Sequence, residues 1–374
     1  MKKLETVVML IVIIVIIGSG GCNKHEKSEF NSGFDKSELL ELITVAEHMY
    51  DSVDISGFKT PLPTEYIRVY RSPVSVLKNR FDIWKSEKSK VVIAIRGTIL
   101  DKKGISFAED FHAYMVPAIG KIKISNEITF QYKLAELSGA GVHLGLLLGL
   151  YTLHEDMIEQ INLRYTEGVR NYYIIGHSQG SGVAYLATAY LWYLQKDGKL
   201  PSDIQFKTYC IAAPKSGNTP FAYDYENLTK GGWAFSIQNT ADWIPYCPIT
   251  FETAGDLPPI SGFTKVREVL TEIHYPPGPN FNDAYAKYGK LQNEVLDGMQ
   301  QVIKEIIYPK ISALFPEYVE PELIKSLDFE RIGVTIPLIA DKDYYKKFPD
   351  SKAHFNVWEN HSPYPYYYLA GKMK

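Results

Sequence analysis

A short glycine-flanked turn in the middle of the chain constrains the fold more than any other feature. The pentapeptide Gly176-His177-Ser178-Gln179-Gly180 follows an apolar run at residues 172–175 and precedes a helical pattern at residues 179–195. It fits the G-x-S-x-G elbow, in which a serine on a sharp strand-to-helix turn exposes its hydroxyl. Such a turn is crowded, and glycine at the flanking positions avoids a Cβ clash. We predict that Ser178 is a nucleophile; the alternative is a plain strand-to-helix turn.

Apolar runs and amphipathic helical patterns alternate along the rest of the chain. This alternation is typical of an α/β sheet with helices on both faces, and the fully apolar run at 91–95 suits a strand buried on both sides. We predict an α/β-hydrolase fold with a mostly parallel central sheet and a helical insertion before the last strand. The expected strands are residues 66–70, 81–84, 91–95, 172–175, 206–211, 233–238 and 333–339, and the expected helices are 34–50, 134–163, 179–195 and 282–315.

The N-terminus reads as a targeting segment followed by a tether. Two lysines precede an apolar run at residues 7–17, and small residues then lead to Cys22, which resembles a bacterial lipoprotein signal. We expect a signal peptide at 1–21, a polar tether at 22–33 and one catalytic domain at 34–374, with an insertion at about 256–330. Lipidation of Cys22 would anchor the protein to a membrane of the bacterial cell envelope, facing the periplasm or the surface. The alternative is an ordinary cleaved signal.

Composition excludes several classes of function. The net charge of −3 and the lack of a lysine- or arginine-rich stripe argue against a nucleic-acid binder. We expect no cofactor and no metal, because the sequence has neither a phosphate-binding glycine loop nor a cluster with metal-ligand spacing. The two cysteines after Cys22, Cys210 and Cys247, could form one bridge, but we expect them to be unpaired because Cys210 lies in an apolar strand pattern that suits a small core residue.

A serine nucleophile needs a histidine base and an orienting carboxylate, which in this fold follow the serine in the order acid, then histidine. For the acid we predict Asp242, in the loop at 239–245 just beyond a predicted strand. Asp224 and Asp256 are competitors, and the alternative role for Asp242 is a helix cap or Asx turn.

For the base we predict His361, which lies beyond the last predicted strand, with His354 as the fallback and His274 as the remaining downstream histidine. The alternative is a surface histidine in an aromatic tail.

An oxyanion hole requires two N–H donors. One is expected from Gln179, directly after the nucleophile, and the other from Thr98, which ends the Arg96-Gly97-Thr98 turn after the strand at 91–95. The alternative for the latter is an ordinary strand-end turn.

Several separated segments resemble the class 3 lipase family of α/β-hydrolases. They are the oxyanion strand at 93–98, the Val-His-x-Gly helix start at 142–145, the elbow at 176–180, the Ala-Pro-Lys-Ser-Gly-Asn segment at 213–218 and the acid loop at 239–245. The resemblance implies hydrolysis of lipid or related carboxylic esters through an acyl-enzyme.

The resemblance implies that Ser178, Asp242 and His361 form a triad, with Thr98 and Gln179 as oxyanion donors. The chain also departs from the family. Gln179 replaces an apolar residue, Ser181 replaces a common glycine, and 119 positions separate the predicted acid from the predicted base. The helical segment at 281–315 within that gap is either a lid over the site or a structural insertion packed away from it.

Two rival functions remain open. Within enzymes, the family resemblance also embraces esterases acting on feruloyl or polysaccharide esters, which should have an open, aromatic-lined groove. Outside enzymes, the fold could serve a non-catalytic binding lipoprotein. An apolar surface around the site would favour a lipase.

Overall fold

The computed structural model describes residues 30–50, 59–87, 89–253, 255–257, 270, 272, 274, 279–349 and 357–374. The predicted signal peptide, Cys22, most of the tether and His354 lie outside the described residues. Residues up to Asn31 form one unit and Ser32–Lys374 form a second, which contains every element discussed below.

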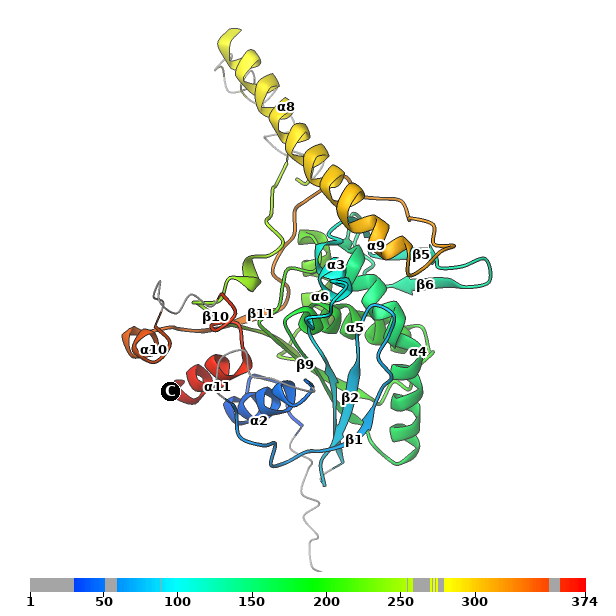
Figure 1. Ribbon diagram of the computed structural model, residues 1–374, viewed down its shortest axis with the longest axis vertical. Coiled ribbons are helices and arrows are strands. Elements are labelled where there is room, and N and C mark those ends of the chain that lie inside the picture. The colour runs from blue at the N-terminus through cyan, green and yellow to red at the C-terminus, as the bar shows by residue number, and fades with distance from the viewer. Residues whose placement is uncertain are drawn as a thin grey trace, which may run out of the picture. The chain divides into compact units, whose positions relative to one another are not determined.

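The larger unit is built on a seven-stranded sheet in the order β1-β2-β3-β8-β9-β10-β11 (Figure 1). Every pair from β3 onward is parallel, and the first two pairs are antiparallel. This mostly parallel sheet confirms the predicted α/β-hydrolase fold. The strands are β1 (Ile67–Arg71), β2 (Phe81–Lys85), β3 (Lys90–Ile95), β8 (Asn171–His177), β9 (Gln205–Ile211), β10 (Ala234–Asn239) and β11 (Val334–Leu338).

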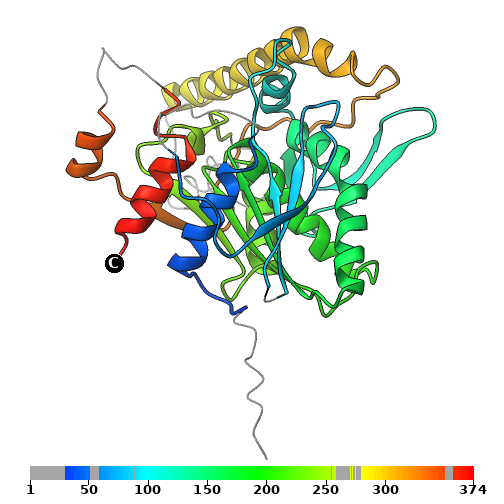
Figure 2. The ribbon, with the colours of Figure 1, turned by 60° about the horizontal axis from the view of Figure 1, so that its bottom comes forward.

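Helices cover both faces of the sheet, as predicted, and the alternation of side chains along β8 shows how (Figure 2). Tyr172 and Ile174 belong to the main hydrophobic core with α4 (Leu144–Thr166) and α5 (Gln179–Lys196). The intervening Tyr173 points to the other face, where its hydroxyl donates to Glu38 of α2 (Lys36–Glu47). Helix α11 (Pro363–Lys372) packs beside α2 on that second face. Two shorter helices belong to the same unit: α6 (Thr219–Leu228) follows β9, and α10 (Lys342–Lys347) follows β11.

The segment before α4 differs from the prediction. Residues 134–143 do not extend the helix, because their backbone pairs with residues 115–118 instead: Leu134 N–H donates to the Ala118 carbonyl, and Ala118 N–H donates to the Ala140 carbonyl. Short strands that the sequence analysis did not predict result from this pairing and from the hairpin beside it. They are β4 (Met115–Pro117) paired with β7 (Gly141–His143), and β5 (Ile119–Lys123) paired with β6 (Thr129–Lys133).

The predicted helical insertion lies between β10 and β11. It contains α8 (Pro279–Val302), a π-helical turn η2 (Ile303–Ile307) and α9 (Tyr308–Ser312). Its second half is anchored, because Ile303, Ile311 and Phe315 are buried in the main core, and Leu296 packs into a smaller cluster with Phe329. Figure 1 shows the first half of α8 projecting beyond the sheet. Among the described residues, no helix has the length and apolarity needed to cross a bilayer. Cys210 and Cys247 are both free, as expected.

Candidate active site

The elbow between β8 and α5 holds Ser178 in a strained backbone conformation. Its φ of 60° and ψ of −132° lie in a region that non-glycine residues rarely occupy, at a cost of about 1–3 kcal/mol. Glycine is required at both flanking positions because a side chain there would clash with neighbouring backbone atoms. A Cβ on Gly176 would lie 2.2 Å from the Gly180 carbonyl carbon, and one on Gly180 would lie 2.1 Å from the Ile95 carbonyl oxygen. The fold therefore stores strain at the residue that the sequence marks as a nucleophile.

His361 and Asp242 meet in a direct hydrogen bond although 119 positions separate them. His361 Nδ1 lies 2.7 Å from Asp242 Oδ2. The same carboxylate oxygen accepts the Tyr366 hydroxyl at 2.7 Å, and Asp242 Oδ1 accepts the Ile244 N–H at 3.0 Å. Asp242 is 1% exposed. Because its carboxylate accepts from His361, the imidazole carries a proton on Nδ1 and presents Nε2 as the basic nitrogen.

The loops carrying the acid and the base are tied together by side chains. Asn239, at the end of β10, accepts the Ala241 N–H and donates to the Asn360 carbonyl at 3.0 Å. Trp243, next to the acid, donates its indole N–H to the Val357 carbonyl at 2.8 Å. These bonds fix Asp242 relative to the tail turn that ends in His361.

The second ring nitrogen of His361 is placed to act on a group in the cavity. Nε2 is buried and has no hydrogen-bond partner among the described residues. Ser178, which is 8% exposed, and His361, which is 6% exposed, line the same cavity. An imidazole whose Nδ1 is held by a carboxylate and whose Nε2 has no partner is able to accept a proton from a hydroxyl that comes within hydrogen-bond reach in the same cavity.

His177, inside the elbow motif, links the nucleophile turn to the base. Its Nε2 lies 2.7 Å from the His361 carbonyl oxygen, so that nitrogen must donate, and Nδ1 then accepts from the Tyr50 hydroxyl at 3.1 Å. Burial, reinforced by the neighbouring His361, lowers the pKa of His177 to about 3. The His177 ring is therefore neutral, and its hydrogen bond positions the backbone of His361.

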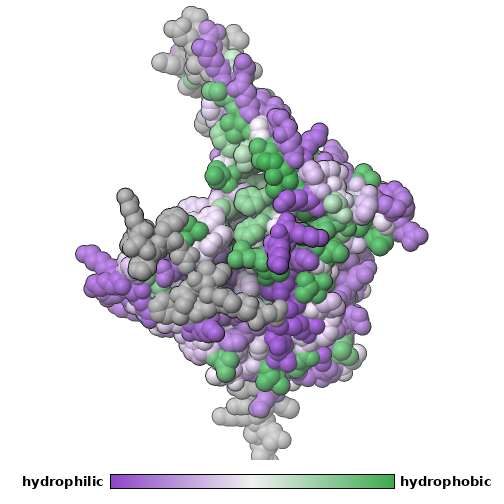
Figure 3. All heavy atoms as spheres, viewed as in Figure 1, coloured by the Kyte–Doolittle hydropathy of each residue, from purple (hydrophilic) through white to green (hydrophobic). Residues whose placement is uncertain are grey.

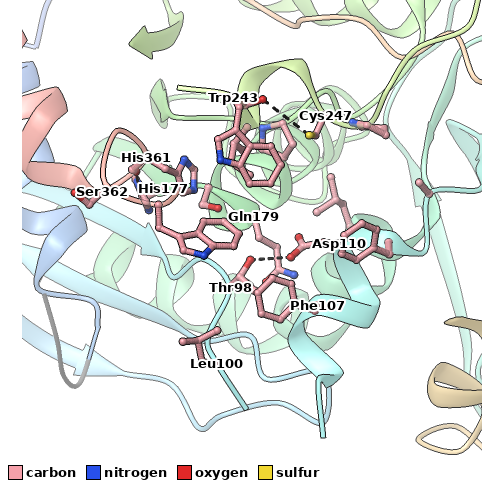
Figure 4. Close-up of a pocket in the computed structure, with 18 of the residues that line it drawn as sticks. Thr98, Leu100, Phe107, Asp110, His177, Gln179, Trp243, Cys247, His361 and Ser362 are labelled. Atoms are coloured by element: carbon pink, nitrogen blue, oxygen red, sulfur yellow. Dashed lines mark hydrogen bonds between the residues drawn. The ribbon is translucent and has the colours of Figure 1, made fainter. Parts of the chain in front are cut away.

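Thr98 and Gln179 both lie at the cavity next to the elbow turn (Figure 4). Neither backbone N–H has an acceptor among the described residues, as an oxyanion hole requires. The amide of Gln179, the residue where the chain departs from the class 3 pattern, donates from Nε2 to the Ser106 carbonyl at 2.9 Å and so ties the elbow to α3 (Ile105–Phe111).

Asp110 on α3 belongs to this site and was not predicted. It lines the cavity and accepts a hydrogen bond from the Thr98 hydroxyl at 2.8 Å. Because the hydroxyl hydrogen is used in this bond, the backbone N–H is the donor that Thr98 can offer to a substrate. Burial raises the pKa of Asp110 to about 7, against the opposing effects of Thr98, Gln179 and His361.

The rival acids and bases have other environments. Asp224 accepts the backbone N–H groups of Glu136 and Leu137, and Asp256 accepts from Thr253. His274 is exposed. None of the three lines the cavity that contains Ser178.

The cavity around Ser178 has a volume of about 660 Å³, within the range of roughly 300–1,000 Å³ typical of ligand pockets. Its lining includes polar side chains such as Thr98, Asp110 and His361, whereas much of the remaining lining is apolar or aromatic, and Figure 4 shows Leu100, Phe107 and Trp243 around the cavity. The insertion contributes to the wall with Met299, Val302, Ile303 and Ile307. Among the described residues, no cluster of three or more histidine, cysteine, aspartate or glutamate side chains could hold a metal ion.

Sequence reasoning missed three groups at the site: Tyr366, Asp110 and His177. Tyr366 lies in an aromatic tail where nothing in the pattern distinguishes one tyrosine from its neighbours. His177 occupies the variable second position of the elbow motif. Asp110 follows the oxyanion turn by twelve residues, and that position after Arg96-Gly97-Thr98 is the one signal that could have drawn attention to it.

Comparison with known proteins finds similarity to lipases. Residues 92–252 match the family model described as Lipase (class 3). That segment contains Thr98, Ser178, Gln179 and Asp242 and ends before the insertion and His361. No curated protein matches the chain.

Similar solved structures include three fungal lipases. The Rhizomucor miehei lipase in its propeptide complex has a TM-score of 0.41 and 16% identity, over 59% of this chain and 66% of that one. The triacylglyceride lipase of Rhizomucor miehei has a TM-score of 0.43 and 15% identity, over 59% and 77%. Lipase II from Rhizopus niveus has a TM-score of 0.40 and 20% identity, over 57% and 75%. The aligned region thus spans two thirds to about three quarters of these chains.

Proposed function

We propose that this protein is a serine carboxylic-ester hydrolase related to the class 3 lipases, acting on lipid esters such as acylglycerols or phospholipids. The observation that carries the proposal is the Asp242–His361 hydrogen bond beside Ser178, with the second imidazole nitrogen of His361 unoccupied and all three groups placed around one elbow. The family match over residues 92–252 supports the same reaction class.

The mechanism follows from these positions. Ser178 Oγ attacks the ester carbonyl carbon while His361 Nε2 takes its proton, and Asp242 stabilises the imidazolium. The N–H groups of Thr98 and Gln179 stabilise the negative oxygen of the tetrahedral intermediate. When the C–O bond to the alcohol breaks, His361 returns the proton to the leaving alcohol, and the acyl group remains on Ser178. Water, deprotonated by His361 Nε2, then attacks the acyl carbon; when the C–O bond to Ser178 breaks, His361 returns the proton to the serine oxygen and the acid is released.

Exposed apolar side chains at the cavity mouth favour a lipid substrate. Leu100 is 81% exposed, Ile249 79% and Phe111 60%, and all three line the cavity. Exposed apolar surface of this kind, joined to a pocket, is characteristic of a binding surface for an apolar partner. Figure 3 shows hydrophobic residues gathered around the base of the projecting helix α8.

Aromatic side chains in the same cavity favour a second candidate, an esterase for aromatic acyl groups such as ferulate. Trp358 lies 5.4 Å from Trp243 and 6.2 Å from Phe107 between ring centroids, and the three rings line the cavity near His361. Rings at these separations can stack on an aromatic acid.

The proposed reaction is tested by hydrolysis of p-nitrophenyl esters from two to sixteen carbons and of methyl ferulate, with the full chain and its Ser178→Ala variant. We expect hydrolysis that Ser178→Ala reduces on the order of a million-fold in turnover, by analogy with removal of the nucleophile in subtilisin. A fluorophosphonate should label Ser178 and no other residue. Activity that survives in Ser178→Ala, or an absence of hydrolysis and labelling, would refute the proposal; preference for methyl ferulate would favour the second candidate.

Anchoring is a separate proposal that rests on the sequence around Cys22. We propose that Cys22 is lipidated and holds the enzyme on a membrane of the bacterial cell envelope, next to lipid substrate. Metabolic labelling with radioactive palmitate should mark the full chain and not its Cys22→Ser variant. Equal labelling of both would refute it.

A further inference from the structure

One wall of the catalytic cavity is formed by a segment outside the part of the chain that resembles lipases. Met299 and Val302 at the end of α8, with Ile303 and Ile307 of the π-helical turn η2, line the cavity that contains Ser178. All four side chains are apolar and project from consecutive turns of helix. The family match ends at residue 252, so the class 3 pattern does not account for this wall.

The wall is fixed in place by contacts on its other side. Ile303 is 5% exposed and belongs to the main core. The Tyr114 hydroxyl donates to the Gln300 carbonyl at 2.9 Å, one turn before Ile303. Turn η2 also packs against α3, the helix that brings Phe107 and Asp110 to the cavity. The segment is therefore both a packed structural insertion and part of the site, which joins the two roles that the sequence left as alternatives.

The apolar side chains of the wall favour contact with a hydrocarbon chain over contact with a polar group. The four side chains carry no N–H, O–H or oxygen, whereas other parts of the lining present polar side chains, including Thr98, Asp110 and His361. A sugar hydroxyl or peptide group against the wall would lose its hydrogen bonds to water without replacement. A hydrocarbon chain loses none and gains contact with each methylene added.

We propose that Met299, Val302, Ile303 and Ile307 form the acyl-chain wall of this enzyme and set the chain length that it prefers. The inference rests on the proposed ester hydrolysis and adds the acyl group as the part of the substrate that the insertion selects. In a hydrophobic pocket, each methylene that fits or fails to fit changes kcat/KM by about 10- to 200-fold. A side chain that fills the space beside the wall should therefore penalise long chains and not short ones.

The test compares two valine positions on α8. Val302 lines the cavity and is 52% exposed, so a larger side chain can be accommodated without overfilling the core. Val295, two turns earlier, is 41% exposed and is not part of the cavity lining. The variants Val302→Trp and Val295→Trp thus add the same indole at two similarly exposed sites on the same helix.

The assay measures kcat/KM for p-nitrophenyl butyrate and laurate below the concentration at which either ester aggregates. We expect Val302→Trp to lower the laurate-to-butyrate ratio at least tenfold, and Val295→Trp to leave it unchanged. Met299→Ala removes bulk from the wall and should raise the ratio for palmitate against butyrate. This second variant keeps the test decisive if the tryptophan disturbs folding.

Unchanged ratios in both wall variants would overturn the proposal, and so would an equal shift in Val295→Trp, which would point to an effect of surface hydrophobicity. Failure of the wild-type chain to hydrolyse any ester would overturn the proposed function itself and this inference with it. Failure of the inference alone leaves hydrolysis that depends on Ser178 but whose chain-length profile does not respond to the wall.

Discussion

Replacing Gly97 by alanine should disable the site by pushing the oxyanion turn away from the elbow. An ideal Cβ on Gly97 would lie 2.4 Å from the His177 carbonyl oxygen, 2.5 Å from the Tyr50 hydroxyl and 3.1 Å from Ser178 Cβ. The tyrosine end can rotate, but His177 lies in strand β8 and its carbonyl cannot move independently. Ordinary contact begins near 3.4 Å, so the turn that carries Thr98 must shift by about 1 Å, a displacement that can cost roughly 100-fold in rate.

The expected result of Gly97→Ala is therefore a kcat about 100-fold lower, with a stability loss of about 1–3 kcal/mol from overpacking. Ester hydrolysis and urea denaturation of the same preparations measure the two effects. Gly289→Ala on α8 is the matched control, since nothing lies within 4 Å of its Cβ, and it should leave kcat unchanged and stabilise the helix by up to about 1 kcal/mol.

A second variant separates the backbone contact from the side-chain contact. In a Tyr50→Phe background the hydroxyl at 2.5 Å is gone, but the His177 carbonyl remains, so Gly97→Ala should stay impaired. Full activity of Gly97→Ala with unchanged stability would refute the reasoning, because the turn would then not rest on the elbow. Full activity restored only by Tyr50→Phe would show that the side-chain contact, not the backbone contact, determines the effect.

Three further predictions concern buried polar contacts. Tyr366→Phe removes one of the donors to the Asp242 carboxylate, so it should lower the free energy of unfolding by about 1.5–3 kcal/mol; urea denaturation measures this loss, and no change would contradict the assigned bond. The pKa of Asp110 is raised from 3.8 to about 7 in the folded chain. The folded state therefore binds more protons than the unfolded state, and the free energy of unfolding falls as pH rises between these values, by no more than about 4 kcal/mol. Denaturation from pH 4 to 8 should show a smaller fall in Asp110→Asn, and an equal fall in both proteins would exclude a shifted Asp110. Lys207 is 1% exposed and pairs with Glu38 at 2.5 Å, so Lys207→Met should destabilise by about 3 kcal/mol because it leaves that carboxylate without its cation; a smaller loss in the Lys207→Met, Glu38→Gln double variant would confirm the coupling.

Local signals predicted the parts of the fold in which sequence and structure agree closely. The apolar runs at 91–95 and 172–175 became β3 and β8, which are buried on both faces, and the lack of charged residues in these runs reports that burial directly. The β5–β6 hairpin was missed because each strand has only five residues and β5 has a single buried position, too little for a clear period. The start of α4 was placed too early because an apolar stretch does not show whether its backbone pairs with a strand or forms a helix.

In the site, too, features with a local sequence signal were predicted and features that depend on distant contacts were not. The elbow turn at Ser178 could be predicted because it requires glycines at fixed offsets, so its signal lies in adjacent residues. Tyr366 and Asp110 act through contacts between segments far apart in the sequence: the Tyr366 hydroxyl reaches an acid 124 positions away. No local pattern carries such a pairing, because any tyrosine in the tail satisfies the same local preferences.

The long gap between Asp242 and His361 changes how the site is held together. His361 lies on a tail turn that is attached to distant segments, among other contacts by the His177 ring on its carbonyl, the Asn239 amide on the Asn360 carbonyl and the Asp242 carboxylate on Nδ1. The insertion that lengthens the gap forms none of these attachments. Its cavity-lining residues can therefore change in size or sequence without moving the acid relative to the base, provided that the buried anchor at Ile303 is kept. This separation allows one chain to combine fixed reaction geometry with a variable acyl wall.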